Sequence, residues 1–312
     1  MTFKNLSTHK LVNIVSRLFH SRHFYYGLLF GVGLCLAFFP ISFRFTKSND
    51  IFSFKHPQVP ILKTKEKPNL STNYYILLDN DSNKIILSKN ENGRIYPAST
   101  TKLATALTAL NIYPLEEVVT IPSEYTDGKV MELKAGEKVT IKTLVAGLLI
   151  YSANDAAFNL ANHYSGGVPA FINQMNKLVE KYNLKNTHFV NFDGLHNENH
   201  YSTPYDLAQL GRIASQNPTL REFVKTKSLN LSDLNGQIVH HVTSTNELLE
   251  IIPEIEGLKT GWTPEASGSF IGLININGHY LISVVAQSED RFTDTKLLIG
   301  WAKNNLNWRT YQ

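Results

Sequence analysis

Apolar and polar positions along the chain predict strands at both ends of one domain and helices between them. Residues 74–88 predict a hairpin that turns near residue 82. Residues 269–275 and 279–285 are rich in strand-forming residues and flank Asn277-Gly278, the strongest short hairpin signal. The middle is mainly helical, and a last helical run follows the second hairpin. We therefore expect an α/β fold of the α+β type, in which helices cover one antiparallel sheet and a helical lobe is inserted.

Residues 97–110 predict a buried helix, because a proline precedes a run of small and apolar residues. The run begins with a Ser-x-x-Lys string formed by Ser99 and Lys102. Residues at i and i+3 share a helix face, so the Lys102 amine can reach the Ser99 hydroxyl and serve as its base. A capping serine with an outward lysine explains most lone strings of this kind. A second copy at 7–10 lies in a basic leader, where no active site can form.

Ser152 and Asn154 form a Ser-x-Asn string in a predicted turn between two helices. Such a turn can present a hydroxyl and an amide to a cleft, although a simple helix cap explains the string equally well. The other two Ser-x-Asn strings begin at Ser71, in a polar linker, and at Ser244.

A Lys-Thr-Gly string, Lys259, Thr260 and Gly261, occurs once and comes before the second hairpin. We expect it on or beside a strand that borders the cleft. Taken alone, the string is more typical of a strand-to-turn junction with a solvated lysine.

The three strings occur in the order found in class A β-lactamases and penicillin-binding proteins. Further runs from about Tyr74 to about Trp301 agree with one branch of that group, at 133–137, 148–157, 189–195, 201–208 and 245–249. The chain thus resembles the serine-type D-alanyl-D-alanine carboxypeptidases, the low-molecular-mass penicillin-binding proteins. It departs from them at Ala266-Ser267, where the family usually has Ala-Gly. We expect no C-terminal β-domain or membrane-binding tail after Gln312.

The resemblance implies a β-lactamase/transpeptidase-like fold with the active site between the sheet and the helical lobe. Ser99 would attack the carbonyl of the penultimate D-alanine of a peptidoglycan stem peptide, and water would hydrolyse the acyl-enzyme. Lys102 would be the base, with a pKa lowered by burial and by the charge of Lys259. Ser152 would pass a proton to the leaving amine, and Asn154 would hold the substrate amide and Lys102.

The resemblance also implies that Lys259 and Thr260, followed by Gly261, bind the substrate carboxylate. The oxyanion hole would be the backbone N–H groups of Ser99 and Trp262. Arg291 is a candidate second carboxylate contact, and a solvated charge at the start of the last helix explains it equally well. β-Lactam antibiotics would be covalent inhibitors, and no cofactor is required.

Other functions fit parts of the same pattern. A DD-endopeptidase that cleaves peptidoglycan cross-links would use the same residues. A class A β-lactamase would need a Glu-x-x-Leu-Asn string between Ser152 and Lys259, and none occurs. An inactive, membrane-tethered wall-binding protein could keep the fold, but it would not need all of these polar groups.

The N-terminal region predicts a single-pass membrane anchor. Residues 1–23 form a basic cytoplasmic leader, and residues 24–43 carry no charge over a length that spans about 30 Å of hydrocarbon as a helix. Basic residues before the span place the N-terminus in the cytoplasm and the rest outside. Residues 44–72 predict an extracytoplasmic stalk, and residues 73–312 the catalytic domain. A cleaved signal peptide is the alternative, although Cys35-Leu36-Ala37 is a poor cleavage site.

Charge and composition exclude several other classes. Six of the 30 Lys and Arg residues precede Asp50, which leaves 24 against 26 acidic residues, a net charge of −2. Nothing therefore indicates nucleic-acid binding. The single cysteine, Cys35, lies in the apolar span, so the outer domain has no disulfide. No string has metal-ligand spacing, and we expect the histidine pairs at 240–241 and 196 and 200 at the surface.

Overall fold

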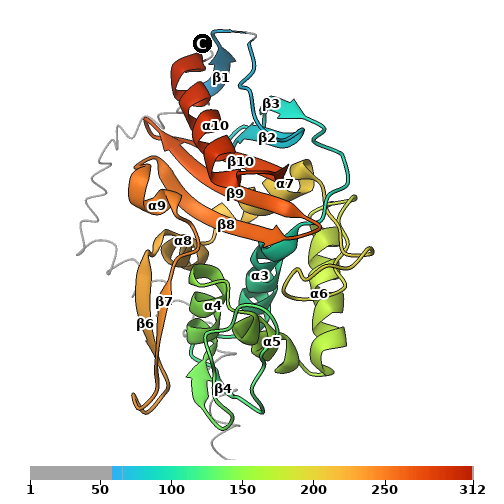
Figure 1. Ribbon diagram of the computed structural model, residues 1–312, viewed down its shortest axis with the longest axis vertical. Coiled ribbons are helices and arrows are strands. Elements are labelled where there is room, and N and C mark those ends of the chain that lie inside the picture. The colour runs from blue at the N-terminus through green and yellow to red at the C-terminus, as the bar shows by residue number, and fades with distance from the viewer. Residues whose placement is uncertain (1–57, 65, 311–312) are drawn as a thin grey trace, which may run out of the picture. The chain divides into compact units, whose positions relative to one another are not determined.

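The computed structural model describes residues 58–64 and 66–310, which lie in one compact unit spanning His56–Gln312. At its centre is an antiparallel sheet of five strands (Figure 1). Its strands follow the order β3 (Ile85–Lys89), β2 (Tyr74–Asp79), β10 (His279–Ser288), β9 (Ser267–Ile276) and β8 (Ile255–Thr263). Both predicted hairpins are present, and Asn277 and Gly278 close the second with φ values of 53° and 87°, as a two-residue turn of this kind requires.

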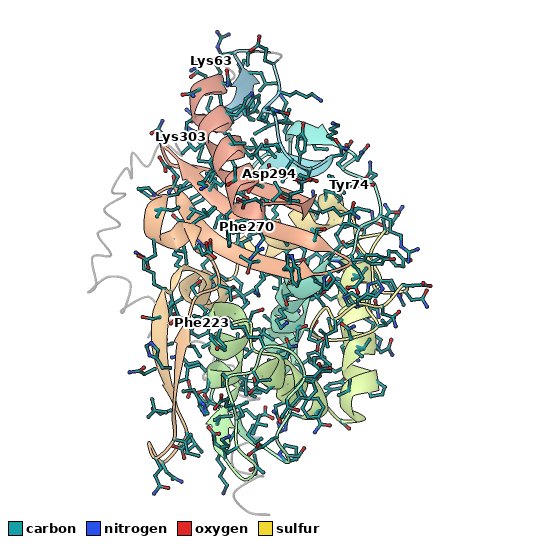
Figure 2. The ribbon with its side chains drawn as sticks, in the orientation of Figure 1. Lys63, Tyr74, Phe223, Phe270, Asp294 and Lys303 are labelled. Atoms are coloured by element: carbon teal, nitrogen blue, oxygen red, sulfur yellow. The ribbon has the colours of Figure 1, made fainter. Side chains whose placement is uncertain are left out.

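Both faces of the sheet are covered. Side chains alternate along a strand, so Tyr75 and Leu77 of β2 face one layer while Ile76 and Leu78 face the other. The first layer is α10 (Arg291–Asn305), and the second contains α7 (Pro204–Ser215) and α8 (Pro218–Lys225). Figure 2 labels Phe270 in the sheet core beneath α10 and Phe223 in the core around α8. The predicted antiparallel sheet covered by helices is confirmed.

The inserted helical lobe is built around a helix that is buried on all sides. Every residue of α3 (Lys102–Ile112) from Lys102 to Ala109 is buried. A short 3-10 helix, η1 (Ala98–Thr101), precedes α3 and packs on β8 and β9. The other helices of the lobe are α4 (Ile141–Ile150), α5 (Asn154–Asn162) and α6 (Gly167–Lys181).

Smaller elements complete the described region. They are the hairpins β4 (Val118–Thr120) with β5 (Lys138–Thr140) and β6 (Ser228–Ser232) with β7 (Val239–Thr243), and the short helix α9 (Leu248–Ile251).

The predicted stalk at 44–72 is wrong over its second half. Strand β1 (Gln58–Leu62) pairs antiparallel with β11 (Leu306–Thr310), a strand that the sequence pattern did not predict. The catalytic unit therefore begins before residue 73. The apolar segment 24–43 lies outside the described residues, and within them no helix is both long and apolar enough to cross a membrane.

Candidate active site

The Ser99 hydroxyl and the Lys102 ammonium lie where the i, i+3 spacing predicts. Lys102 Nζ donates to Ser99 Oγ over 2.9 Å and to the backbone carbonyl of Asp193 over 2.8 Å. Ser99 lies within η1 and is partly exposed, whereas Lys102, the first residue of α3, is fully buried. The Ser99 hydroxyl, which is partly exposed to solvent, is thus paired with a Lys102 amine that is shielded from water.

Burial lowers the pKa of the Lys102 ammonium to about 8, while the Asp193 carboxylate acts in the opposite direction. The expected burial effect is therefore present. The charge of Lys259 was expected to lower the pKa of Lys102, but the repulsion between the two amines acts on Lys259 instead. Burial and then repulsion from Lys102 hold the pKa of Lys259 well below its usual range.

Ser152 and Lys259 form the second polar pair of the site. Lys259 Nζ donates to Ser152 Oγ over 2.9 Å, across 107 positions in the sequence, and to the carbonyl of Thr260 over 3.1 Å. Ser152 lies in the predicted turn between α4 and α5, and its φ of 66° is a left-handed conformation that costs energy in a non-glycine residue. This strained turn aims the hydroxyl at the buried lysine.

The Lys-Thr-Gly string lies in β8, the edge strand of the sheet, as its place before the hairpin predicts. A Cβ atom on Gly261 would lie 3.0 Å from the Ser99 backbone nitrogen, so glycine lets β8 approach η1 closely. Trp262 follows with 59% of its surface exposed. Near this strand, Ala266-Ser267 stands where the family usually has Ala-Gly. Ser267 has a φ of 53°, a conformation that glycine adopts without strain.

Asn154 faces the loop that precedes β5 rather than Lys102. Its side-chain amide donates to the carbonyl of Asp127 over 3.0 Å, and its backbone N–H donates to the carbonyl of Lys129 over 2.6 Å. Among the described residues, the expected hydrogen bond between Asn154 and Lys102 is not formed. The Asp193 carbonyl occupies that position instead.

Arg291 lies at the start of α10 and carries a partly buried guanidinium. Its charge adds to the lowering of the pKa of Lys259. Its buried Nε has no hydrogen-bond partner, and its guanidinium carbon is 4.4 Å from the centre of the Phe292 ring.

Two contacts at the site could not be predicted from the sequence. The Asp193 carbonyl accepts from Lys102 because Gly194, with a φ of 89°, lets its loop press against Ala98: a Cβ on Gly194 would be 1.9 Å from the Ala98 oxygen. Thr245 Oγ1 lies 2.8 Å from Thr260 Oγ1, so the segment that carries the Ser-x-Asn string at Ser244 contacts the Lys-Thr-Gly strand.

The prediction that the histidines lie at the surface is wrong for His200 and His240. His200 is buried, accepts from the backbone N–H of Val190 at Nδ1 and contacts Thr101 Oγ1 at 2.8 Å. Burial lowers its pKa to about 3, so the ring is neutral and Nε2 donates to Thr101. His240 is buried with Nε2 2.8 Å from Glu137 Oε1. Each ring thus has a partner at both of its nitrogens, and the second partner of His240 is the carbonyl of Met131 at 2.8 Å.

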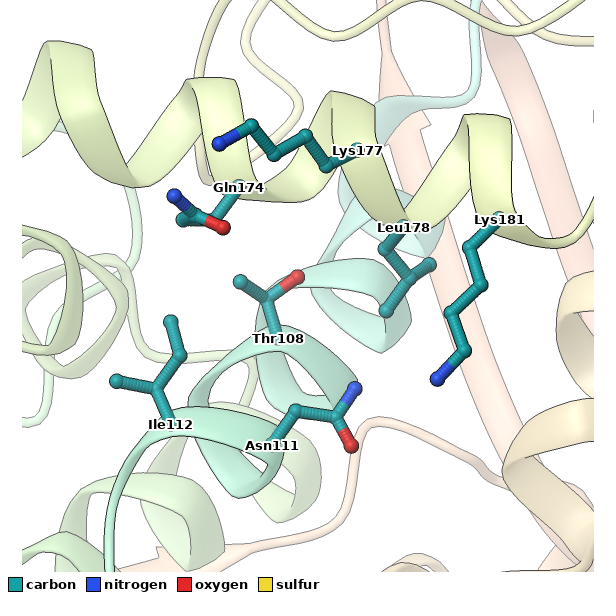
Figure 3. A pocket seen from close by; sticks show the side chains of 7 residues that line it. All are labelled: Thr108, Asn111, Ile112, Gln174, Lys177, Leu178 and Lys181. Atoms are coloured by element: carbon teal, nitrogen blue, oxygen red, sulfur yellow. The ribbon is translucent and has the colours of Figure 1, made fainter.

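A cavity of about 160 Å³ lies between α3 and α6, at the end of α3 remote from Ser99 (Figure 3). None of the predicted site residues lines it, and its lining is Thr108, Asn111, Ile112, Gln174, Lys177, Leu178 and Lys181. Within the described part of the chain, no cluster of three or more His, Cys, Asp or Glu side chains could hold a metal ion.

Two Ser-Lys pairs, each with a buried amine, at the junction of an antiparallel sheet and a helical lobe form the arrangement of a serine acyl-transfer enzyme. The comparison with protein families agrees. Residues 61–290 match peptidase family S11, D-alanyl-D-alanine carboxypeptidase, and the chain belongs to this family.

Individual relatives show the extent of the similarity. The chain is 32% identical over 198 residues to the D-alanyl-D-alanine carboxypeptidase DacF of Bacillus subtilis, covering 61% of this chain and 51% of DacF. It is 31% identical over 260 residues to DacD of Salmonella typhimurium, covering 77% of this chain and 65% of DacD. The chain therefore spans between half and two thirds of the length of these curated relatives.

A Streptomyces protein gives the structural comparison. The D-alanyl-D-alanine carboxypeptidase of Streptomyces sp. strain K15 is 33% identical over 240 residues, covering 71% of this chain and 82% of that protein. The crystal structure of the K15 DD-transpeptidase matches with a TM-score of 0.72 and 31% identity, over 76% of this chain and 98% of that one. The described fold is thus similar to that of the K15 enzyme.

Proposed function

We propose that the chain is a penicillin-binding D-alanyl-D-alanine carboxypeptidase, which removes the terminal D-alanine from peptidoglycan stem peptides through an acyl-enzyme on Ser99. The observation that carries this proposal is the 2.9 Å hydrogen bond between the partly exposed Ser99 hydroxyl and the fully buried Lys102 amine. Membership of the S11 family supports the same activity.

In the acylation step, neutral Lys102 accepts the Ser99 proton while Oγ attacks the carbonyl of the penultimate D-alanine. The backbone N–H groups of Ser99 and Trp262 bind the developing oxyanion, an interaction worth about 3 kcal/mol in serine peptidases. The close packing of Gly261 on Ser99 supports this pairing of strand and helix backbones. Ser152, hydrogen-bonded to Lys259, gives its hydroxyl proton to the leaving amine and is reprotonated by the Lys102 ammonium, which returns Lys102 to its neutral form. Neutral Lys102 then takes a proton from the water that attacks the ester, and passes it to Ser99 Oγ as the acyl bond breaks.

The pKa of Lys102 predicts the pH dependence of acylation. Only the neutral amine can accept the Ser99 proton, so the acylation rate should rise with pH and level off above about pH 8. Stopped-flow measurement of labelling by a fluorescent penicillin between about pH 6 and pH 9 tests this. A rate that does not change over this interval would show that Lys102 is not the titrating base.

The basic residues at one end of the site predict that the enzyme recognises the terminal carboxylate of its substrate. Lys259, Thr260 and Arg291 would bind this group. A charge-assisted hydrogen bond contributes about 1.5–3 kcal/mol, so amidating the terminal D-alanine should lower kcat/KM by roughly 10- to 150-fold. Lys259→Ala should blunt that preference. Equal cleavage of acid and amide by the wild type would favour an endopeptidase instead.

One observation favours a second reaction of the same acyl-enzyme. The similar K15 protein is named a DD-transpeptidase, which supports transfer of the acyl group to an amine in place of water. Incubation of a diacetylated tripeptide ending in D-Ala-D-Ala, with and without glycylglycine, separates the two outcomes by mass spectrometry. A cross-linked muropeptide in parallel tests endopeptidase activity.

We also propose that residues 24–43 remain attached as a membrane anchor, which would hold the catalytic domain outside the cytoplasmic membrane. The uncharged span and the basic residues before it support this topology. The native protein should resist extraction by high salt, and external protease should release the domain by cleavage between residues 44 and 57. A variant that begins at His56 should be soluble. A soluble mature form that starts near Phe38 would show a cleaved signal peptide.

A further inference from the structure

A buried carboxylate lies beside the proposed general base and has no part in the mechanism so far. Asp193 is 2% exposed, and its backbone carbonyl accepts a hydrogen bond from Lys102 Nζ over 2.8 Å. Its side chain accepts from the backbone N–H of Leu195 at Oδ1 over 3.1 Å and from the Tyr125 hydroxyl at Oδ2 over 3.4 Å. Both of these donors are neutral. Burial of a carboxylate is costly unless a nearby positive charge compensates it.

The residues on either side of Asp193 hold it in a fixed place against α3. Thr105 Oγ1 of α3 donates to the carbonyl of Phe192 over 2.5 Å. On the other side, a Cβ on Gly194 would lie 1.9 Å from the carbonyl oxygen of Ala98, so the backbone there packs tightly on η1. The carbonyl and the carboxylate of Asp193 are therefore presented together to the first turn of α3.

Asp193 supplies the negative charge around Lys102. Its carboxylate raises the pKa of Lys102, against the larger and opposite effect of burial. Three other titratable groups lie around this pair, and none of them is negative. The His200 ring has a pKa of about 3 and is neutral, and Lys259 is a second amine. Burial and then the Asp193 carboxylate raise the pKa of Tyr125, so its hydroxyl keeps its proton.

We propose that Asp193 is a positioning residue, the third member of a Ser99, Lys102 and Asp193 triad, whose carboxylate stabilises the Lys102 ammonium that forms during acylation. This inference rests on the proposed function. The proton passes from Ser99 Oγ to Lys102 Nζ as Oγ bonds to the substrate carbonyl carbon, so a positive charge forms on a fully buried amine. The Asp193 carbonyl holds that amine and the carboxylate balances its charge, without taking a proton. A buried carboxylate supports the histidine base of other serine peptidases in the same way.

Stabilisation of the ammonium affects the two limbs of the pH profile differently. At high pH the resting amine is neutral, so loss of the Asp193 charge should slow acylation by disfavouring the ammonium of the transition state. At low pH the resting amine is already charged, so the same loss makes more neutral base available. Because proton transfer is incomplete in the transition state, the gain at low pH equals or exceeds the loss.

The test compares pH profiles of penicillin labelling for the wild type, Asp193→Asn and Glu124→Gln. Asparagine removes the charge and keeps the side-chain shape and the backbone carbonyl. Glu124 is the matched control, because it is an exposed carboxylate next to Tyr125 in the sequence. Labelling rates are measured by stopped flow between about pH 5 and pH 9.

We expect the profile of Asp193→Asn to level off about one pH unit below that of the wild type, at a rate roughly 3- to 10-fold lower. At the acidic end its rate should equal or exceed that of the wild type. Glu124→Gln should follow the wild-type profile.

Two results would overturn the role of Asp193. One is an unchanged profile in Asp193→Asn, and the other is a rate lowered by the same factor at every pH, which would mean that Asp193 only packs its loop. Circular dichroism verifies folding, and Asp193→Ser repeats the test if Asp193→Asn does not fold.

A second measurement needs no catalysis. The titration of Lys102 is followed through the NMR signal of its isotope-labelled Cε, assigned with Lys102→Met protein, and its midpoint should fall to lower pH in Asp193→Asn. A wild type that penicillin does not label would reject the proposed function. The midpoint would still decide whether the Asp193 carboxylate stabilises the Lys102 ammonium, and an unchanged midpoint would overturn that role.

Discussion

Ser99→Ala should abolish both penicillin labelling and release of D-alanine, the largest effect expected from any single substitution in this chain. The change removes the only atom that can form the acyl bond in the proposed mechanism. It removes one hydrogen bond from Lys102, which keeps its bond to the Asp193 carbonyl. The partly exposed side chain is also small, so the fold should survive. Gel fluorescence after labelling, with circular dichroism to verify folding, measures both effects.

Ser152→Ala is the matched control for Ser99→Ala. Ser152 belongs to the same site and is hydrogen-bonded to the other buried lysine, but it forms no covalent bond in the mechanism. We expect slower labelling with the adduct still formed. Labelling that persists in Ser99→Ala and disappears in Ser152→Ala would reverse the two assignments.

Lys102→Met should slow acylation by at least the 10²-fold that is typical of losing a general base. Methionine has a similar length and no charge, so it fills the space of a fully buried side chain without the cost of desolvating an ammonium. The carbonyl of Asp193 loses its donor, which offsets part of that gain. The Tm should therefore stay near that of the wild type while the labelling rate collapses.

The matched control for Lys102→Met is Lys134→Met, at an exposed lysine outside the site. It should label at the wild-type rate. If Lys102→Met labels as fast as Lys134→Met, another group accepts the Ser99 proton.

Contacts within one helical turn could be read from the sequence. Ser99 and Lys102 are three residues apart on a helix, so their hydrogen bond follows from local geometry. The Asn277-Gly278 turn is equally local. The pairing of Ser152 with Lys259 is different, because it joins residues 107 positions apart. Only the resemblance to a family placed them in one site.

Contacts that depend on the backbone or on distant partners could not be read in this way. The Asp193 carbonyl approaches Lys102 through a loop whose side chains carry no signal for that bond. His200 and His240 look like ordinary polar residues until Thr101 and Glu137 supply partners that make their burial possible. The pairing of β1 with β11 joins the two ends of the unit, and neither five-residue segment alone favours a strand strongly.

Peptide mapping of the penicillin-treated wild-type protein tests the acyl-enzyme on Ser99 most directly. After brief labelling and digestion, tandem mass spectrometry should find the penicilloyl mass on the peptide that contains Ser99, with fragment ions that place it on that residue. One adduct per molecule should form, and unlabelled substrate should slow its formation. An adduct on Ser152 or any other residue, or none under conditions that label a known penicillin-binding protein, would contradict the proposed mechanism.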